Sequence, residues 1–220
     1  MNTKRIIFWG IFIIIIAFII WGLIVANNKA PNVGNLTTST AAPVTEADHD
    51  RGSTTSPVTV IEYSDFECPA CRAYYPLIKR LTMEASTTMQ FVYRHFPLYP
   101  VPHKNAFLAA QASEAAANQG KFWEMYDLLF ENQETWANTN TARATFISYA
   151  EQIGLDMVKF NTDIDSEETK ARVSRDKDEG ISIGINSTPT FFINGKAIAN
   201  PQSYEQFKAL IDAAAQSSTN

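Results

Sequence analysis

The chain contains two cysteines, Cys68 and Cys71, in the motif Cys-Pro-Ala-Cys. Two cysteines placed at random in a chain of this length would have this spacing roughly once in a hundred times. The thiolate is the attacking form in thiol–disulfide exchange, and a second thiol close by can resolve a mixed disulfide formed on the first. The motif therefore predicts a redox pair, with Cys68 as the exposed nucleophile and Cys71 as the shielded resolving thiol.

Two other uses of the cysteines are less favoured. An inert disulfide between them would close too small a loop to stabilise the fold much. A zinc site would need further ligands, and the chain has no second cysteine pair and three histidines, His49, His95 and His103. We therefore predict neither a metal nor a cofactor. We interpret His95 and its neighbour Arg94 as packing or capping residues rather than ligands.

The elements around the pair explain why Cys68 would be reactive. Residues 58–63 are mostly β-branched and predict a buried strand, and residues 69–85 have helical spacing with Pro69 at the first turn. Cys68 would then lie at a helix N-terminus, where unpaired N–H groups and the helix dipole favour a thiolate. Two acids just before it, Asp65 and Glu67, should disfavour the thiolate, although exposed charges are well screened.

The rest of the chain predicts an α/β fold. Residues 89–96 alternate like a second strand, residues 190–193 predict a third, and Asn194-Gly195 predicts a hairpin turn back into residues 196–199. Between the second and third strands the pattern is helical, and a last helix closes the chain. The expected helices span residues 104–119, 122–133, 141–152, 166–183 and 201–215. We interpret the charges at 172–179 as a solvated helix face.

The N-terminal part predicts a membrane anchor. Residues 6–26 carry no charge, and as a helix they would span ~31 Å, the thickness of a bilayer core. Lys4 and Arg5 precede them, so the N-terminus should stay in the cytoplasm. A cleaved signal peptide is the alternative, but it favours a shorter apolar core and a small-residue cleavage site. We expect a single-pass protein of the cell membrane with its domain outside the cytoplasm.

The predicted organisation is therefore an anchor at 1–26, a flexible linker at 27–47, one domain at 48–216 with a helical insertion at about 103–186, and a tail at 217–220. The domain is acidic. From residue 48 onward there are 22 acids and 15 bases, a formal charge of −7. This balance argues against nucleic acid as a partner.

Several segments together resemble the DsbA-like branch of the thioredoxin superfamily. Residues 60–71 resemble its active-site segment, and agreement continues, in chain order, at residues 48–52, 93–98, 120–125 and 187–195. The resemblance implies a thioredoxin-like fold with a helical insertion, here preceded by one transmembrane helix. The most oxidising members place a His before the second cysteine, and the dipeptide Pro69-Ala70 lacks it.

The resemblance also implies roles for three further residues. Pro189 would be a cis proline beside the cysteines, and Thr188 would contact the nucleophile and offer backbone groups to an incoming peptide. Glu62 would be a buried acid below the pair, with a raised pKa, moving a proton to or from Cys71. The simpler alternatives are an ordinary strand-edge proline and a solvated glutamate.

We expect a thiol–disulfide oxidoreductase that donates its disulfide to exported, thiol-containing proteins. The resemblance implies reoxidation by a quinone-linked membrane partner that is DsbB-like or of the vitamin K epoxide reductase type. One alternative is a reductase or isomerase that uses the same site with electrons from a membrane donor. The other, from a different class, is a chaperone or binding module with an idle cysteine pair.

Overall fold

In the computed structural model, the described residues are 39–218 together with Trp9, Phe12 and Ile16. The chain divides into two compact units, Met1–Gly34 and Asn35–Asn220, and the second holds the domain. The predicted membrane helix at 6–26 lies outside the described residues except at three positions. Among the residues that are described, no helix combines the length and apolar character needed to span a bilayer.

Five strands form one mixed sheet in the order β1-β3-β2-β4-β5. The two central strands, β2 and β3, are parallel and are joined by helix α2, whereas β1, β4 and β5 pair antiparallel to their neighbours. Asn194 and Gly195 have φ angles of 48° and 79°, so they form the predicted hairpin turn. The strands are β1 (His49–Gly52), β2 (Val58–Ser64), β3 (Met89–His95), β4 (Thr190–Ile193) and β5 (Lys196–Ile198), and α2 is Pro69–Glu84.

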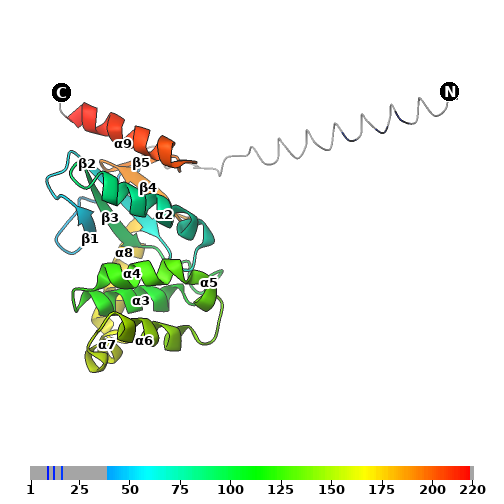
Figure 1. Cartoon of the computed structure of the whole chain (residues 1–220), viewed down its shortest axis with the longest axis vertical. Helices are drawn as coiled ribbons and strands as arrows, with labels where there is room; N and C mark the ends of the chain where they lie inside the picture. The colour runs from blue at the N-terminus through cyan, green and yellow to red at the C-terminus, as the bar shows by residue number, and fades with distance from the viewer. Residues whose placement is uncertain (1–8, 10–11, 13–15, 17–38, 219–220) are drawn as a thin grey trace. The chain divides into compact units, whose positions relative to one another are not determined.

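The helical insertion lies between β3 and β4, as predicted, and Figure 1 shows helices α3 to α7 gathered at one end of the sheet, away from α9. The predicted helix at 122–133 ends at Glu131, and a separate short helix begins at Gln133. Three short elements, β1, α5 and α7, were not predicted from the pattern, because each is too short to show a period. The helices are α3 (Ala106–Ala117), α4 (Phe122–Glu131), α5 (Gln133–Trp136), α6 (Ala142–Gln152), α7 (Met157–Asp163), α8 (Glu167–Ser182) and α9 (Tyr204–Ser218).

The alternation along β2 sends its side chains to two different cores. Val58 and Val60 belong to the larger core, together with residues of α2, α4 and α9. Ile61 and Tyr63 belong to a smaller core on the opposite face. Because side chains two residues apart share one face of a strand, the even-numbered positions of β2 all face α2. Glu62 and Ser64 therefore lie on the face that Cys71 covers.

Part of the predicted linker is packed against the domain. We call residues 39–48 the strap. Thr40 forms a β-bridge with Lys196, Ala41 N donates a hydrogen bond to Gly195 O at 3.0 Å, and Ser39 Oγ donates to Ile183 O at 2.8 Å. The packed chain thus begins before the predicted domain boundary at residue 48.

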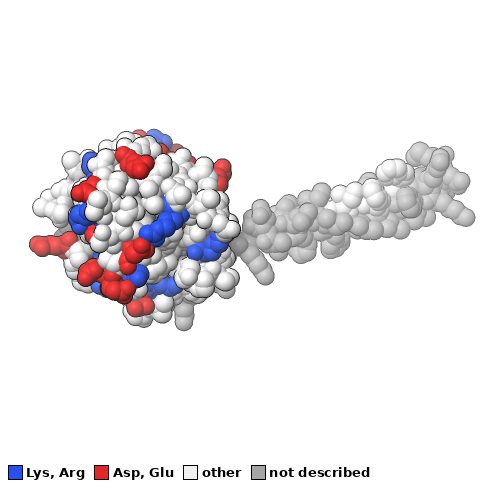
Figure 2. All heavy atoms as spheres, turned by 90° about the horizontal axis from the view of Figure 1, so that it is seen from below, with Lys and Arg blue, Asp and Glu red and all other residues white. Residues whose placement is uncertain are grey.

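The charge cluster on α8 differs from its prediction as a solvated face. Asp176 is buried, and its carboxylate accepts a hydrogen bond from His95 N at 3.1 Å. Arg172, on the same helix, is also largely covered and forms an ion pair with Asp176. Figure 2 shows acidic and basic side chains interspersed over the domain face in view.

Candidate redox-active site

Cys68 and Cys71 occupy the start of α2. Cys68 is the N-cap residue, with an extended backbone (φ −74°, ψ 121°), and Pro69 follows at the first helical position, where no N–H is needed. Both cysteines are free thiols. Cys68 is 6% exposed and Cys71 is 1% exposed, so their order of accessibility agrees with the prediction. The prediction of an exposed Cys68 was nevertheless wrong, because Cys68 is itself almost covered.

The surroundings of the two sulfurs separate their pKa values. A hydrogen bond with Cys71 is the largest cause that lowers the pKa of Cys68, to about 6, and burial opposes it. Contacts with Thr188 and with the Cys71 backbone N–H lower it further, whereas the charge of Asp65 raises it. Burial raises the pKa of Cys71 well above its ordinary value. At neutral pH, Cys68 is therefore the thiolate and Cys71 the thiol.

The fold brings Thr188 and Pro189, the two residues just before β4, to Cys68. The Thr188–Pro189 peptide bond is cis, as the resemblance implies. Cys68 Sγ lies 3.5 Å from the Thr188 carbonyl oxygen. Pro189 O is held by the Asn200 side chain, whose Nδ2 donates to it at 2.8 Å. Cys68, Cys71, Thr188 and Pro189 thus form one site, although 120 residues separate Cys68 from Thr188.

Glu62 lies in the interior and is not a solvated strand-edge residue. It is 2% exposed on β2, and burial raises its pKa to about 8. Ser64 Oγ donates a hydrogen bond to Glu62 Oε1 at 2.7 Å, which opposes the rise, whereas negative charge on Cys68 adds to it. A carboxyl group with a pKa near neutrality is suited to exchange a proton with a buried thiol.

Asp65 and Glu67 are not the exposed charges that the sequence predicts. Both are buried and act as hydrogen-bond acceptors. Asp65 accepts from Leu98 N at 2.9 Å and pairs with His103 Nδ1 at 2.7 Å. Glu67 accepts from the backbone N–H groups at positions 105 and 138, each at 2.6 Å. These two carboxylates fasten the segment before Cys68 to loops of the insertion.

Sequence reasoning missed two polar residues at the site. Gln133, in α5, donates hydrogen bonds from Nε2 to Phe66 O at 2.7 Å and to Cys68 O at 3.0 Å. It lies 65 residues from Cys68 in the chain, and no sequence signal pointed to it. Ser64 was also missed, although its position two residues after Glu62 on a predicted strand places both on one face.

A separate polar cluster joins β1, β3 and α3. His49 Nε2 and His95 Nε2 lie 2.7 and 2.8 Å from the same oxygen, Glu114 Oε1. Within the described part of the chain these three residues form the one group of His, Cys, Asp and Glu close enough to hold a metal ion, and it includes neither cysteine. Arg172 Nε also lies 3.8 Å from Glu114 Oε1. The Glu114 carboxylate thus already has two imidazoles and an arginine as partners in a largely buried cluster.

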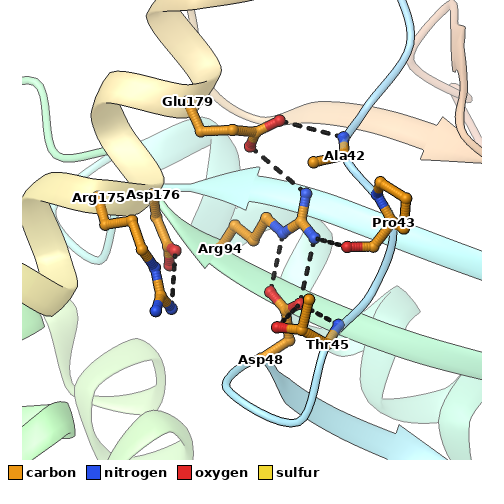
Figure 3. A pocket seen from close by; sticks show the side chains of 8 residues that line it. All are labelled: Ala42, Pro43, Thr45, Asp48, Arg94, Arg175, Asp176 and Glu179. Carbon is orange, nitrogen blue, oxygen red and sulfur yellow. Dashed lines mark hydrogen bonds and ion pairs between the residues drawn. The ribbon is translucent and has the colours of Figure 1, made fainter.

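Arg94 and His95, which we interpreted as packing or capping residues rather than ligands, are both buried. Figure 3 shows Arg94 beside a pocket between the strap and α8, with its guanidinium between Asp48 and Glu179. Arg94 Nε donates to Asp48 Oδ1 at 2.9 Å, and its Nη2 donates to Pro43 O at 3.1 Å. Arg94 thereby binds the strap to the sheet.

The chain is similar in sequence to one part of longer curated proteins. The chain is 39% identical over 166 residues to Na(+)/H(+) antiporter NhaA 3 of Salinispora tropica, a match covering 76% of this chain and 24% of that protein. It is 40% identical over 158 residues to NhaA 1 of Mycolicibacterium gilvum, covering 71% and 25%. The chain therefore spans about a quarter of the length of these curated relatives.

Among solved structures, oxidised BdbD from Bacillus subtilis matches with a TM-score of 0.70 and 24% identity, over 81% of this chain and 98% of that one. Alpha-DsbA1 from Wolbachia pipientis matches with a TM-score of 0.68 and 23% identity, over 80% and 94%. These likenesses show the fold. A family model described as Thioredoxin matches residues 44–213, well over half of the chain. The chain thus belongs to the thioredoxin family and has the DsbA-like form of its fold, with a helical insertion between two strands of the sheet.

Proposed function

We propose that this protein is a thiol–disulfide oxidoreductase that donates a disulfide to reduced proteins outside the cytoplasm. The observation that carries the proposal is the pairing at the start of α2: Cys68 has a pKa of about 6, and Cys71 is a buried thiol. A substrate thiolate would attack the Cys68 sulfur of the oxidised pair and release Cys71. A second substrate thiol would then displace Cys68 and complete the substrate disulfide.

The thiolate also indicates the direction of exchange. At pH 7, ionisation stabilises the reduced form of a thiol with a pKa of about 6 roughly tenfold more than that of a thiol with an ordinary pKa. This factor corresponds to about 1.4 kcal/mol. This energy stabilises the reduced pair, and it raises the reduction potential by about 30 mV. We therefore expect a potential above the value of about −270 mV typical of thioredoxin and below the value of about −120 mV of the strongest oxidants.

The location and partners follow as parts of the same proposal. The apolar run at residues 6–26 would anchor the protein in the cell membrane, with the domain on the outer side. A quinone-linked membrane protein, DsbB-like or of the vitamin K epoxide reductase type, would reoxidise the pair. Antiport is not proposed for this chain, because the relatives named as antiporters are matched over about a quarter of their length.

The test is the equilibrium of the Cys68–Cys71 pair with mixtures of reduced and oxidised glutathione, followed by transfer of the disulfide to a reduced, unfolded protein. We expect the potential given above and stoichiometric transfer, with no transfer by the Cys68→Ser variant. A reductase is the second candidate, because the charge of Asp65 raises the pKa of Cys68 and so disfavours the thiolate. A potential at or below about −270 mV would establish that direction instead.

A further inference from the structure

Ser64 lies between the buried acid and the buried thiol. It is the last residue of β2 and is 1% exposed. Its hydroxyl donates to Glu62 Oε1 at 2.7 Å. The same hydroxyl interacts with the sulfur of Cys71, where it favours the thiolate against the effect of burial. One side chain therefore connects two groups that exchange a proton in the proposed reaction.

The other hydroxyl groups around Glu62 do not make this connection. Tyr93, on β3, and Tyr126, on α4, are both buried, and negative charge on Glu62 contributes to raising their pKa values after the larger effect of burial. Neither phenolic oxygen has a hydrogen-bond partner among the described residues. Tyr74, on α2, hydrogen-bonds Pro201 O instead. Ser64 is thus the hydroxyl bonded to Glu62 in this part of the structure.

We propose that Ser64 relays the proton between Glu62 and Cys71. A hydroxyl group is suited to this role because it donates one hydrogen bond while it accepts another. Glu62 and Cys71 influence one another through their charges, and Ser64, whose hydroxyl is hydrogen-bonded to Glu62, also lowers the pKa of Cys71. The proposal rests on the thiol–disulfide exchange proposed above and adds a residue to it.

The substrate thiolate forms a bond to Cys68 Sγ, the Cys68–Cys71 bond breaks, and its electron pair remains on Cys71 as a thiolate. Ser64 gives its proton to this thiolate and takes one from protonated Glu62. The products are the mixed disulfide between the substrate sulfur and Cys68, the Cys71 thiol, the Ser64 hydroxyl and the Glu62 carboxylate, so the substrate sulfur has been oxidised and Cys71 reduced. When Cys71 attacks a mixed disulfide, the proton moves in the opposite direction.

The charge of Cys68 couples this relay to the redox state. Glu62 has a pKa of about 8, raised first by burial and also by negative charge on Cys68. A Cys68 sulfur in a disulfide has no such charge, so Glu62 then releases its proton more readily. After the second exchange Cys68 becomes a thiolate again, and its charge favours uptake of a proton from solution by Glu62. The acid is therefore a better donor at the stage at which Cys71 needs a proton.

The experiment compares Ser64→Ala, Glu62→Gln and the double variant. The measured quantity is the stopped-flow rate at which reduced glutathione opens the Cys68–Cys71 disulfide, between pH 5 and 9. We expect each single variant to be slower by about 100-fold, the lower end of the effect of general acid–base catalysis. We expect the double variant to be no slower than Glu62→Gln, because a relay without its acid has nothing to transfer. Ser64→Thr keeps the hydroxyl and should restore most of the rate.

Ser113→Ala is the matched control, since Ser113 is a buried serine of α3 whose Oγ donates to Ala110 O at 2.8 Å, within the insertion. It should leave the rate and its pH profile unchanged. A Ser64→Ala rate equal to wild type would overturn the relay while leaving the exchange reaction intact. The relay would also be overturned if Ser64→Ala slowed the reaction by the same factor in the wild-type protein and in Glu62→Gln, because the loss of rate would then be structural. If the wild-type disulfide does not react with glutathione, the proposed function fails, and the relay fails with it.

Discussion

Removing Cys71 should return the pKa of the Cys68 thiol part of the way to its ordinary value. The hydrogen bond with Cys71 is the largest cause of the lowered pKa of Cys68, about 6 against an ordinary value of 9.0. A hydrogen bond to a charged group contributes about 1.5–3 kcal/mol. At 1.36 kcal/mol for each pKa unit, Cys71→Ala should raise the pKa of Cys68 to between about 7 and 8. The contacts with Thr188 and with the backbone N–H groups of α2 would retain the rest of the effect.

The assay is the thiolate absorbance of reduced protein as a function of pH, checked by the rate of alkylation with iodoacetamide. At pH 7 the alkylation rate of Cys68 should fall by about two- to tenfold in Cys71→Ala, in proportion to the thiolate fraction. Cys71→Ser keeps a hydroxyl donor and should titrate closer to 6. If Cys71→Ala still titrates near 6, the helix end and Thr188 hold the thiolate, and the assigned cause is wrong.

Three further predictions concern buried charged or titratable groups in and beyond the site, each measured by urea unfolding. Glu67→Ala should lower the free energy of unfolding by about 2–4 kcal/mol, because two backbone N–H groups of the insertion lose their buried acceptor; loss of less than about 0.5 kcal/mol, as at an exposed carboxylate, would contradict this. Arg94→Met should cost about 3–5 kcal/mol, since Asp48 would remain buried without its partner, and an unchanged unfolding midpoint would exclude that account. Acid should destabilise the domain in two stages. Burial lowers the pKa of His95, so stability is lost as the pH falls below the ordinary value of 6.5. Although burial opposes its ionisation, the hydrogen bonds of Glu114 hold its pKa below the ordinary value of 4.5, so more stability is lost below that pH; equal stability at pH 5.5 and 7.5 would refute the assignment for His95.

Local sequence was sufficient for the parts of the fold that depend on neighbouring residues. The β-branched run before Cys68, the proline after it and the Asn194-Gly195 turn each specify a backbone conformation within a few positions. The cysteine pair was therefore placed correctly at the start of a helix. β1, α5 and α7 escaped prediction because four to seven residues are too few to show a period.

The surroundings of the pair depend on distant residues and were harder to predict. Asp65 and Glu67 look like solvent-exposed acids in a polar segment, yet their partners are N–H and imidazole groups 33 to 71 residues further along the chain. Gln133 reaches the carbonyl of Cys68 in the same way. Such contacts arise when the insertion packs against the sheet, and no local pattern reveals them. The strap was missed because its Thr, Ser, Ala and Pro composition is also that of a flexible linker.

The strap has a consequence for aggregation. An edge strand with free N–H and C=O groups is a template on which other extended chains can pair. At one edge of this sheet, β5 has three residues, and residues 39–41 lie beside it through a β-bridge and backbone hydrogen bonds. At the other edge, β1 has four residues, two of which are charged. The protein is proposed to act on unfolded, strand-forming substrates, yet the edges of its sheet are poorly suited to pairing with them. Contact with those chains is therefore left to the site of Cys68 and Cys71.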